Sequence, residues 1–256
     1  MLDLIYEIFA VADAEVRKLM RDPTELLSRA VQPILWLAVF GQVFSRVRGI
    51  PTGNLNYLDY MAPGILAQSI LFSSIFYGIA IIWERDLGIV HKLLVTPAHR
   101  SALVLGKAVA AGLRGLLQAV VVYLVAILVK VDIHWEFGSM LIVIAAVFIG
   151  SCIFATFSLL IACIVKTRER FMGIGQVLTM PLFFASNAIY PLALMPDWLK
   201  SVAAFNPLTY LVDALRGSMI VGGESVYGNG MSFGVMALVF SILVALASKL
   251  YPGLAR

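Results

Sequence analysis

Apolar residues along this chain fall into six long runs that are separated by short polar segments. The runs cover approximately residues 26–45, 58–82, 102–129, 137–165, 171–191 and 231–250. A helix needs about 20 predominantly apolar residues to cross the hydrocarbon core of a bilayer, and each run reaches this length, the first with the help of its flank. The pattern therefore predicts an all-α membrane protein with six transmembrane helices.

Residues 1–22 have a different pattern, in which apolar residues repeat with the period of a helix. Leu4, Ile8 and Ala12 share one face, while charged residues occupy the other. This predicts an amphipathic helix on the membrane surface, in front of a transmembrane domain of residues 23–256. A helix packed against a protein partner has the same pattern, so both interpretations stay open. Because the first apolar run begins behind this charged stretch, no cleavable signal peptide is expected.

The segment 191–223 is too broken for one span and too apolar for a free loop. It contains three prolines and carries Trp198 and Tyr210, aromatic residues of the kind that gather at membrane interfaces. We expect two short interfacial or re-entrant helices on the outer side of the membrane, divided at Asn206 and Pro207.

The composition agrees with a membrane protein and excludes several other classes. Of the 256 residues, 61% are hydrophobic and 13% are charged, whereas soluble domains contain about 25% charged residues. The runs leave no room for a separate soluble domain, and no phosphate-binding P-loop sequence occurs, so any ATP must be bound by another chain. The net charge of +4 comes without a basic tract interleaved with aromatic residues, so no nucleic acid is expected as a partner.

Lysine and arginine residues are distributed unevenly between the two sides of the predicted spans. With the N-terminus inside, thirteen of the nineteen lie in inner segments and five in outer segments, and Arg114 lies within a span. Cytoplasmic segments carry an excess of these residues. The distribution therefore predicts a multi-pass protein of the cell membrane with both termini in the cytoplasm.

The cytoplasmic segment 84–100, between the second and third spans, is the most informative loop. It begins with three charged residues, continues with one or two amphipathic turns, and ends at Thr96-Pro97. A short helix of this kind, parallel to the membrane, fits a groove in a soluble partner. A solvated turn with snorkelling basic residues explains the same pattern, so the physical argument alone leaves both interpretations open.

A series of short motifs extends over about residues 30–250. They are Tyr57-Leu58-Asp59-Tyr60-Met61-Ala62-Pro63-Gly64-Ile65, Trp83-Glu84-Arg85-Asp86-Leu87-Gly88, Leu93-Leu94-Val95-Thr96-Pro97, Leu105-Gly106-Lys107, Gly173-Ile174-Gly175-Gln176, Met180-Pro181-Leu182-Phe183-Phe184-Ala185-Ser186-Asn187, Asn206-Pro207-Leu208-Thr209-Tyr210 and Val212-Asp213-Ala214-Leu215-Arg216. In this order and spacing they resemble the permeases of ABC-2-type exporters, close to the daunorubicin-resistance-like branch for multidrug, lipid or polysaccharide export.

The resemblance implies a six-span subunit that pairs with a second permease copy, as a homodimer, around a translocation path. Two copies of an ABC ATP-binding subunit would dock below and hold ATP and Mg²⁺, while this chain binds no cofactor and catalyses no reaction. The coupling helix would lie in the loop and use Glu84, Arg85, Asp86, Leu87, Gly88, Val90, Lys92, Leu93, Leu94, Thr96 and Pro97. The outer re-entrant gate would use Asn206, Pro207, Tyr210, Asp213 and Arg216.

Candidate residues of the translocation path lie within the spans. Arg114 lies about 18 Å from the inner end of its span at 1.5 Å per residue, where a charge is costly and indicates function by default. Gln118, one turn away, is its expected hydrogen-bond partner, and a purely structural pairing of Arg114 with another helix explains it equally well. The remaining candidates, for which a place in the core or against lipid is the simpler alternative, are Phe72, Phe76, Phe183, Phe184 and Asn187.

Other polar residues have simpler structural interpretations. Lys107, near the inner end of its span, is expected to snorkel, and Asp213 and Arg216, three residues apart, are expected to pair with each other. Cys152 and Cys163 are about 16 Å apart on one predicted helix, which is too far for a disulfide. The three histidines show no metal-ligand spacing.

The sequence therefore predicts the permease subunit of an ATP-driven exporter of an amphipathic substrate: a drug, lipid, polyketide or lipid-linked glycan. The alternative is a stand-alone secondary transporter or channel. It is disfavoured because the spans contain few acidic residues for ion coupling. An intramembrane enzyme is disfavoured because no catalytic cluster is recognisable.

Overall fold

The computed structural model describes residues 2–21, 31–45, 55–96, 99–165 and 167–255. Most of these residues are helical, and the β-pairing among them is one isolated antiparallel bridge between Ile133 and Ile220. The described part of the chain is thus all-α, as predicted.

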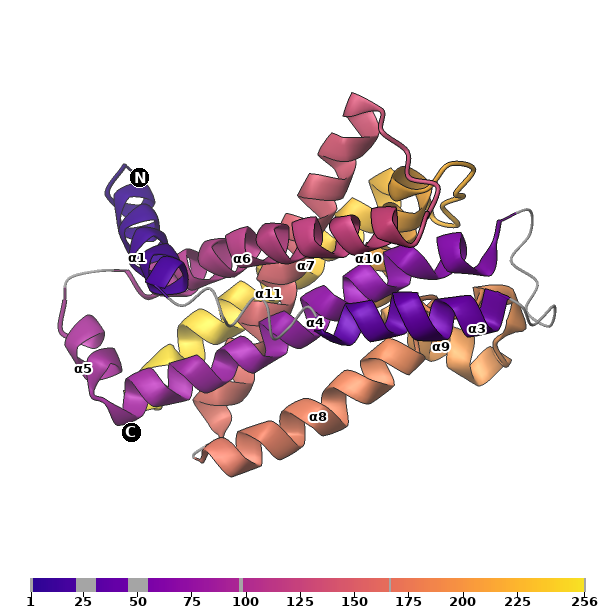
Figure 1. Cartoon of the computed structure of the whole chain (residues 1–256). Coiled ribbons are helices and arrows are strands. Elements are labelled where there is room, and N and C mark those ends of the chain that lie inside the picture. The colour runs from indigo at the N-terminus through magenta and orange to yellow at the C-terminus, as the bar shows by residue number, and fades with distance from the viewer. Residues whose placement is uncertain (1, 22–30, 46–54, 97–98, 166, 256) are drawn as a thin grey trace.

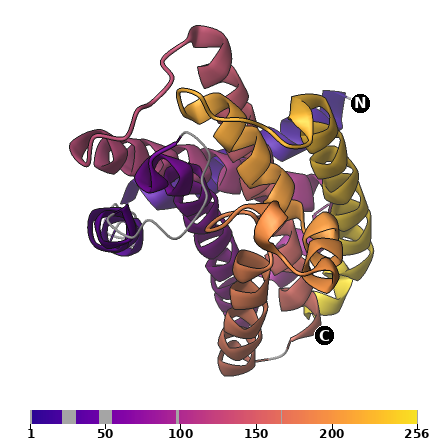
Figure 2. The ribbon, with the colours of Figure 1, turned by 90° about the vertical axis from the view of Figure 1, so that its right-hand side faces the viewer.

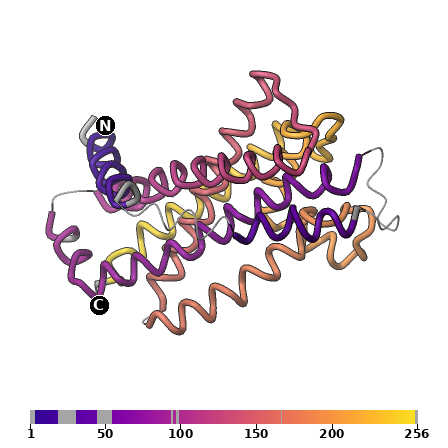
Figure 3. Tube along the Cα trace, viewed as in Figure 1, coloured from indigo at the N-terminus to yellow at the C-terminus, as the bar shows by residue number. Residues whose placement is uncertain are grey.

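The helices form an elongated bundle (Figures 1 and 3). The first is α1 (Leu2–Arg21), and the second runs from residue 31 through the π-helical η1 (Trp36–Gly41) into α3 (Gln42–Ser45). They are followed by α4 (Tyr57–Asp86), α5 (Ile89–Leu94), α6 (Arg100–Leu128), α7 (Phe137–Ile164), α8 (Arg168–Phe184), η2 (Leu192–Leu194), α9 (Asp197–Phe205), α10 (Pro207–Met219), α11 (Gly228–Leu250) and η3 (Tyr251–Ala255).

Helix α7 is the centre of this bundle. Helices α4, α6, α10 and α11 all pack against it, whereas α8 and the helix at 31–45 lie at the periphery and pack mainly on α4. The peripheral helices expose large apolar side chains such as Val39, Phe40 and Val177. In water such a surface would be unfavourable, but in a bilayer it faces lipid.

The two ends of the bundle carry different elements. Figure 1 shows α1 and α5 at one end, where α11 also finishes, and α9 at the other. Figure 2 looks onto the second end. We call the end with α1 and α5 the inner end and the opposite one the outer end.

Within the described residues, four helices are long and apolar enough to cross a membrane: α4, α6, α7 and α11 with its extension to Leu254. They correspond to the predicted spans 58–82, 102–129, 137–165 and 231–250. The helices at the other two predicted spans are shorter, since the apolar part of the first is Val31–Phe44 and α8 has 17 residues. Residues 26–30 of the first predicted span lie outside the described residues.

Helix α8 ends at Phe184, although the apolar run continues to residue 191. The reason is a polar cap from a distant segment. The side-chain amide of Asn206 donates to the carbonyl of Leu182 at 2.6 Å and to that of Ala185 at 2.9 Å. These bonds satisfy carbonyl groups that a helix leaves free at its C-terminus.

The predicted pair of short helices after α8 is present, as α9 and α10, with Asn206 between them. The Oδ1 atom of Asn206 accepts the N–H of Leu208 at 3.0 Å, and Pro207 occupies the first position of α10. An N-cap asparagine followed by proline is a strong helix start signal. One side chain therefore closes α8 and opens α10.

Candidate coupling site

The predicted coupling loop begins where α4 ends. Gly88 follows with a φ of 73°, a left-handed conformation that glycine adopts without steric cost. This turn redirects the chain from α4 into the short α5. Beyond α5, the hydroxyl of Thr96 donates to the carbonyl of Leu93 at 2.6 Å. Pro97 lies outside the described residues.

The loop has a buried side and an exposed side. Val90 is fully buried and belongs to an apolar cluster that includes Leu103 of α6 and Tyr251 of η3. Leu87 and Val95, by contrast, are 66% and 85% exposed. Val90 thus attaches α5 to its own chain, and Leu87 and Val95 remain available to a partner.

The other predicted coupling residues lie between these extremes. Lys92 and Thr96 are exposed, Leu93 is half-buried, and the side chain of Leu94 lies outside the description.

The first residue of this loop belongs to a group of five charged residues, the inner charge cluster: Glu15, Lys18, Glu84, Lys107 and Arg114. The buried Lys107 is at its centre, with its Nζ atom 2.6 Å from Oε2 of Glu84 and 2.8 Å from Oε1 of Glu15. The ammonium group of Lys18 lies 3.3 Å from Oε1 of Glu15 and also pairs with Glu84. The cluster connects α1, α4 and α6.

The position of Lys107 in the sequence suggested that its side chain reaches the membrane surface. The structure shows instead that the side chain is buried. Its side chain is buried because two carboxylates on other elements meet it there. A buried ammonium group is tolerated when it is paired and hydrogen-bonded.

Arg114 also turns toward α1. Its guanidinium lies 3.5 Å from Oε2 of Glu15 and 4.7 Å from the centre of the Tyr77 ring. The predicted hydrogen bond to Gln118 is absent: among the described residues, neither polar atom of that amide has a partner. The sequence suggested Gln118 because it is one turn away, but α1 packs along α6 and brings in a carboxylate instead. A role of Arg114 in a translocation path stays a prediction.

The electrostatic effect of the cluster is clearest at Glu15. Burial by itself raises the pKa of this carboxyl, but Lys107 and Lys18 outweigh burial and lower the pKa to about 2. Glu15 is thus held ionised by neighbouring cations.

A second set of contacts ties the end of α4 to the connection between α7 and α8. Arg85 donates to the carbonyl of Val165 at 3.2 Å, and Arg168 pairs with Asp86 at 2.8 Å. The guanidinium of Arg168 also stacks 3.3 Å from the centre of the Trp83 ring. Planar guanidinium groups favour both kinds of contact.

A third contact fixes the far end of the loop to α1. The backbone N–H of His99 donates to Oε2 of Glu7 at 2.9 Å, and the Nδ1 atom of the His99 imidazole lies 3.2 Å from the same oxygen. The hydrogen bond from the backbone N–H of His99 lowers the pKa of the Glu7 carboxyl below its ordinary value. The loop is therefore held at both ends by contacts to other helices.

Sequence reasoning missed Glu15, although a signal for it exists. Leu4, Ile8 and Val11 form the apolar stripe of α1, and Glu15 is the next position on that stripe. A lone carboxylate on an apolar face calls for a buried cation. What the sequence did not give was the identity of that cation.

The predicted gate residues lie together at the outer end, but they do not pair as expected. Arg216 donates to the backbone carbonyl of Asn187 at 2.7 Å and lies 3.8 Å from the centre of the Tyr60 ring. Tyr210 donates to the carbonyl of Ala204 at 2.8 Å. No ion pair joins Asp213 to Arg216 among the described residues, so that prediction was wrong.

Asp213 instead binds the segment that begins α11. It accepts the backbone N–H of Val226 at 2.7 Å and that of Tyr227 at 3.1 Å, and the hydroxyls of Ser225 and Ser232 also donate to it. Charge-assisted bonds to backbone N–H groups at a helix start satisfy Asp213 more fully than one arginine would.

The aromatic path candidates form two separate pairs. Phe72 and Phe76 are half-buried neighbours on α4, with ring centres 6.3 Å apart. On α8, Phe183 is buried, Phe184 is exposed, and their rings are 5.4 Å apart. Both polar side-chain atoms of Asn187 are buried without a partner among the described residues. These positions leave the predicted path untested.

The all-α bundle with its apolar, lipid-facing periphery defines a multi-pass membrane protein. The chain belongs to the ABC-2 type transporter family, whose sequence model matches residues 6–220. This match confirms the resemblance seen in the sequence motifs. Members of this family are the membrane subunits of transporters and are not themselves catalytic.

Several named proteins are similar to this chain. The transport permease ycf38 of Cyanophora paradoxa is 30% identical over 83% of this chain and 73% of its own length. Nodulation protein J of Rhizobium leguminosarum bv. viciae is 23% identical over 83% of this chain and 81% of its own length. The doxorubicin resistance ABC transporter permease protein DrrC of Mycobacterium tuberculosis is 24% identical, over 79% and 72% respectively.

Proposed function

We propose that this chain is the permease subunit of an ATP-driven exporter in the cell membrane, with both termini in the cytoplasm. It moves an amphipathic substrate, such as a drug, lipid, polyketide or lipid-linked glycan, out of the cytoplasm. Two copies form a homodimer, and two copies of a separate ABC ATP-binding subunit supply the energy. The segment between α8 and α11 re-enters the membrane from outside and contributes to the outer gate.

The braced loop at the inner end is the observation that carries this proposal. Leu87 and Val95 are exposed on the loop, while Val90 and the charged residues fix it to the spans. A displacement of a subunit seated on the exposed residues therefore moves α4 and α6 with it. Rigid-body movement of one subunit or domain against another is a common form of such a transition.

The substrate class rests on relatives. One is named for doxorubicin resistance, and another, the multidrug ABC transporter permease YbhR of Escherichia coli, is 27% identical over 66% of this chain and 46% of its own length. These names favour export of an amphipathic compound.

The first experiment measures what the chain binds in its own membrane. The tagged chain is extracted gently, and the mass and composition of the complex are determined. We expect two permease copies with two ATP-binding subunits. A complex that never contains an ATP-binding subunit, even after crosslinking in intact membranes, contradicts the proposal.

The second experiment tests the loop. Leu87→Glu and Val95→Glu place a charge on the exposed apolar side chains, so we expect loss of the ATP-binding subunit from the purified complex and loss of export. Phe137→Glu is the matched control, because Phe137, the first residue of α7, is similarly exposed at the outer end and lies outside the segment assigned to the gate. Export that continues when ATP is depleted under clamped ion gradients contradicts the proposal and favours a secondary transporter.

A further inference from the structure

Helices α6 and α7 cross closely and then separate toward the outer end. At the crossing, a side chain on Gly115 would collide with Ser151, and one on Gly112 would collide with the Phe148 ring. The thiol of Cys152 reaches the carbonyl of Ala108 at 3.2 Å. Small residues let membrane helices approach in this way.

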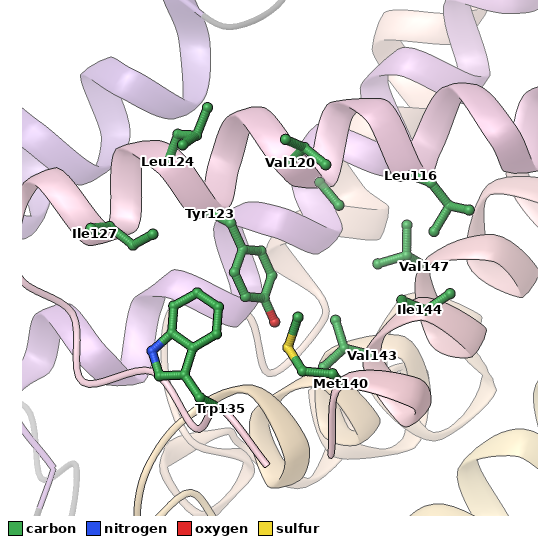
Figure 4. A pocket seen from close by; sticks show the side chains of 11 residues that line it. Leu116, Val120, Tyr123, Leu124, Ile127, Trp135, Met140, Val143, Ile144 and Val147 are labelled. Carbon is green, nitrogen blue, oxygen red and sulfur yellow. The ribbon is translucent and has the colours of Figure 1, made fainter. Parts of the chain in front are cut away.

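A groove of about 420 Å³ occupies this outer wedge between the two helices. Its walls are apolar, and Trp135, from the connection between α6 and α7, closes its outer edge (Figure 4). Val120, Leu124 and Ile144 line the groove and are also exposed on the surface of the bundle. The groove therefore opens sideways, toward the hydrocarbon of the membrane.

One buried hydroxyl group interrupts this apolar lining. Tyr123 is only 9% exposed, and its hydroxyl has no hydrogen-bond partner within the described chain. Figure 4 shows its ring inside the groove, with the hydroxyl near Trp135 and Met140. Buried hydroxyl groups normally find a partner. An occupant of the groove should therefore bring a hydrogen-bond acceptor along with apolar bulk.

The depth of Tyr123 in the membrane indicates which hydrogen-bond acceptor the occupant brings. It lies five residues before the end of α6 at Leu128, which is about 7.5 Å along the helix. Trp135 marks the interface level, where indole rings gather. The polar interface on each side of a bilayer is about 5–8 Å thick. Tyr123 is thus at the level where the ester groups of glycerolipids meet their acyl chains.

We propose that this groove binds one acyl chain of a glycerolipid in the adjoining leaflet, and that the Tyr123 hydroxyl donates to its ester carbonyl. The site is separate from the loop and the path described above, and it makes the bound lipid part of the wall between α6 and α7. In the orientation proposed above, the leaflet is the outer one.

Fluorescence of Trp135 tests occupancy directly. The full chain with Trp36, Trp83 and Trp198 replaced by Phe is placed in bilayer nanodiscs that contain a minor fraction of phosphatidylcholine with brominated acyl chains, which quench tryptophan on contact. We expect half-maximal quenching at a several-fold lower mole fraction than in the matching variant that keeps only Trp198, an exposed tryptophan of α9.

A filling variant and its matched control locate the site. Val120→Phe places a ring in the groove and should remove the excess quenching. Leu128→Phe makes a comparable change at a position on the same helix that is 80% exposed and outside the groove, and it should leave the quenching unchanged. Quenching that follows the bulk mole fraction in all variants overturns the proposal. So does an absence of quenching, which would indicate that a second copy of the chain covers the groove.

The ester carbonyl is tested by chemistry that leaves the apolar contact intact. Brominated lipids with ether linkages lack the carbonyl acceptor. In the chain with Tyr123, half-maximal quenching should therefore need an about fivefold lower mole fraction of the ester lipid than of the ether lipid, which corresponds to one net hydrogen bond. Tyr123→Phe should abolish this preference while quenching persists. Equal quenching by ester and ether lipids in the presence of Tyr123 overturns the assigned hydrogen bond.

Discussion

The inner and outer ends of the bundle use polar residues in different ways. At the inner end, side chains of opposite charge on α1, α4 and α6 pair with one another, with Lys107 at the centre. At the outer end, Asn206, Asp213 and Arg216 bind backbone groups instead. The inner contacts join charged side chains of separate helices, whereas the outer contacts satisfy backbone groups at helix ends and in turns.

This difference follows from the different structural requirements of the two ends. At the outer end, short helices leave N–H and C=O groups unpaired, and in a membrane each such group is costly unless a side chain satisfies it. At the inner end, the ion pairs hold α1 and the loop in register with the spans. Because each charged group of the inner charge cluster is shared among several partners, α1 and the loop stay attached to the spans even when single distances between the groups change. The inner end is thus suited to transmit a displacement and the outer end to preserve a fold.

The largest expected effect comes from removing the central cation of the inner charge cluster. Lys107→Met leaves Glu15 and Glu84 buried, with Lys18 and Arg114 as their remaining partners. Breaking a buried pair on one side costs about 3–5 kcal/mol. We expect a loss of that order in the free energy of unfolding, measured by denaturant titration in detergent.

Lys92→Met is the control for this change, because Lys92 is exposed in the same region. The double variant Lys107→Met/Glu84→Gln should recover part of the loss, since one unpaired charge is removed. If Lys107→Met and Lys92→Met have the same stability, the inner end does not depend on its ion pairs and the comparison fails.

Acid should weaken the inner end through Glu15. The pKa of Glu15 is lowered to about 2 in the folded chain, while an unfolded glutamate has a pKa of about 4.3. A depressed pKa stabilises the fold above the unfolded value, and this stabilisation is lost as the pH falls toward 2. We therefore expect stability to fall between about pH 5 and pH 2.

The variant Glu15→Gln isolates this contribution. It should be less stable than the unmodified chain at neutral pH and should show a shallower decline over the same acid range, as followed by circular dichroism. Parallel curves for the two proteins would mean that Glu15 does not hold α1 through its charge.

Much of the fold was predictable because it depends on local pattern. Apolar runs placed the helices, and the sequence Asn206-Pro207 marked the division between α9 and α10 correctly. The end of α8 was placed too late, since its cap comes from Asn206, which is distant in sequence. Local patterns do not report contacts of this kind.

The polar partners were predicted poorly for the same reason. Spacing along one helix suggested that Arg114 pairs with Gln118 and Asp213 with Arg216. In each case a group from another element competes successfully: Glu15 for Arg114, and backbone N–H groups near Val226 for Asp213. An i,i+3 or i,i+4 pair stabilises a helix by only about 0.2–0.5 kcal/mol, so a better tertiary partner replaces it.

At the outer end, Asp213→Asn tests the cap directly. The amide keeps the shape but loses the charge and one acceptor oxygen, so the bonds to Val226 and Tyr227 weaken. We expect a loss of about 1–3 kcal/mol in stability and faster hydrogen exchange at these two amides. Asp197→Asn, which changes a fully exposed side chain, should have no comparable effect. Unchanged exchange at Val226 would contradict the cap.

The smallest effect is expected at Gly88, where the inner loop depends on backbone conformation alone. Its φ of 73° costs a residue with a Cβ atom about 1–2 kcal/mol, whereas no atom of the described residues lies within 4 Å of where that Cβ would be. Gly88→Ala should therefore lower stability by about 1 kcal/mol, and Gly88→Asn by less, because asparagine tolerates this conformation. At the outer end, a Cβ on Gly64 would collide with the backbone of Ala188, so alanine and asparagine should both be costly there. Thermal unfolding of the four variants separates the two cases. If Gly88→Asn is no more stable than Gly88→Ala, space limits the inner turn as it limits Gly64. The two ends would then be less different than their contacts indicate.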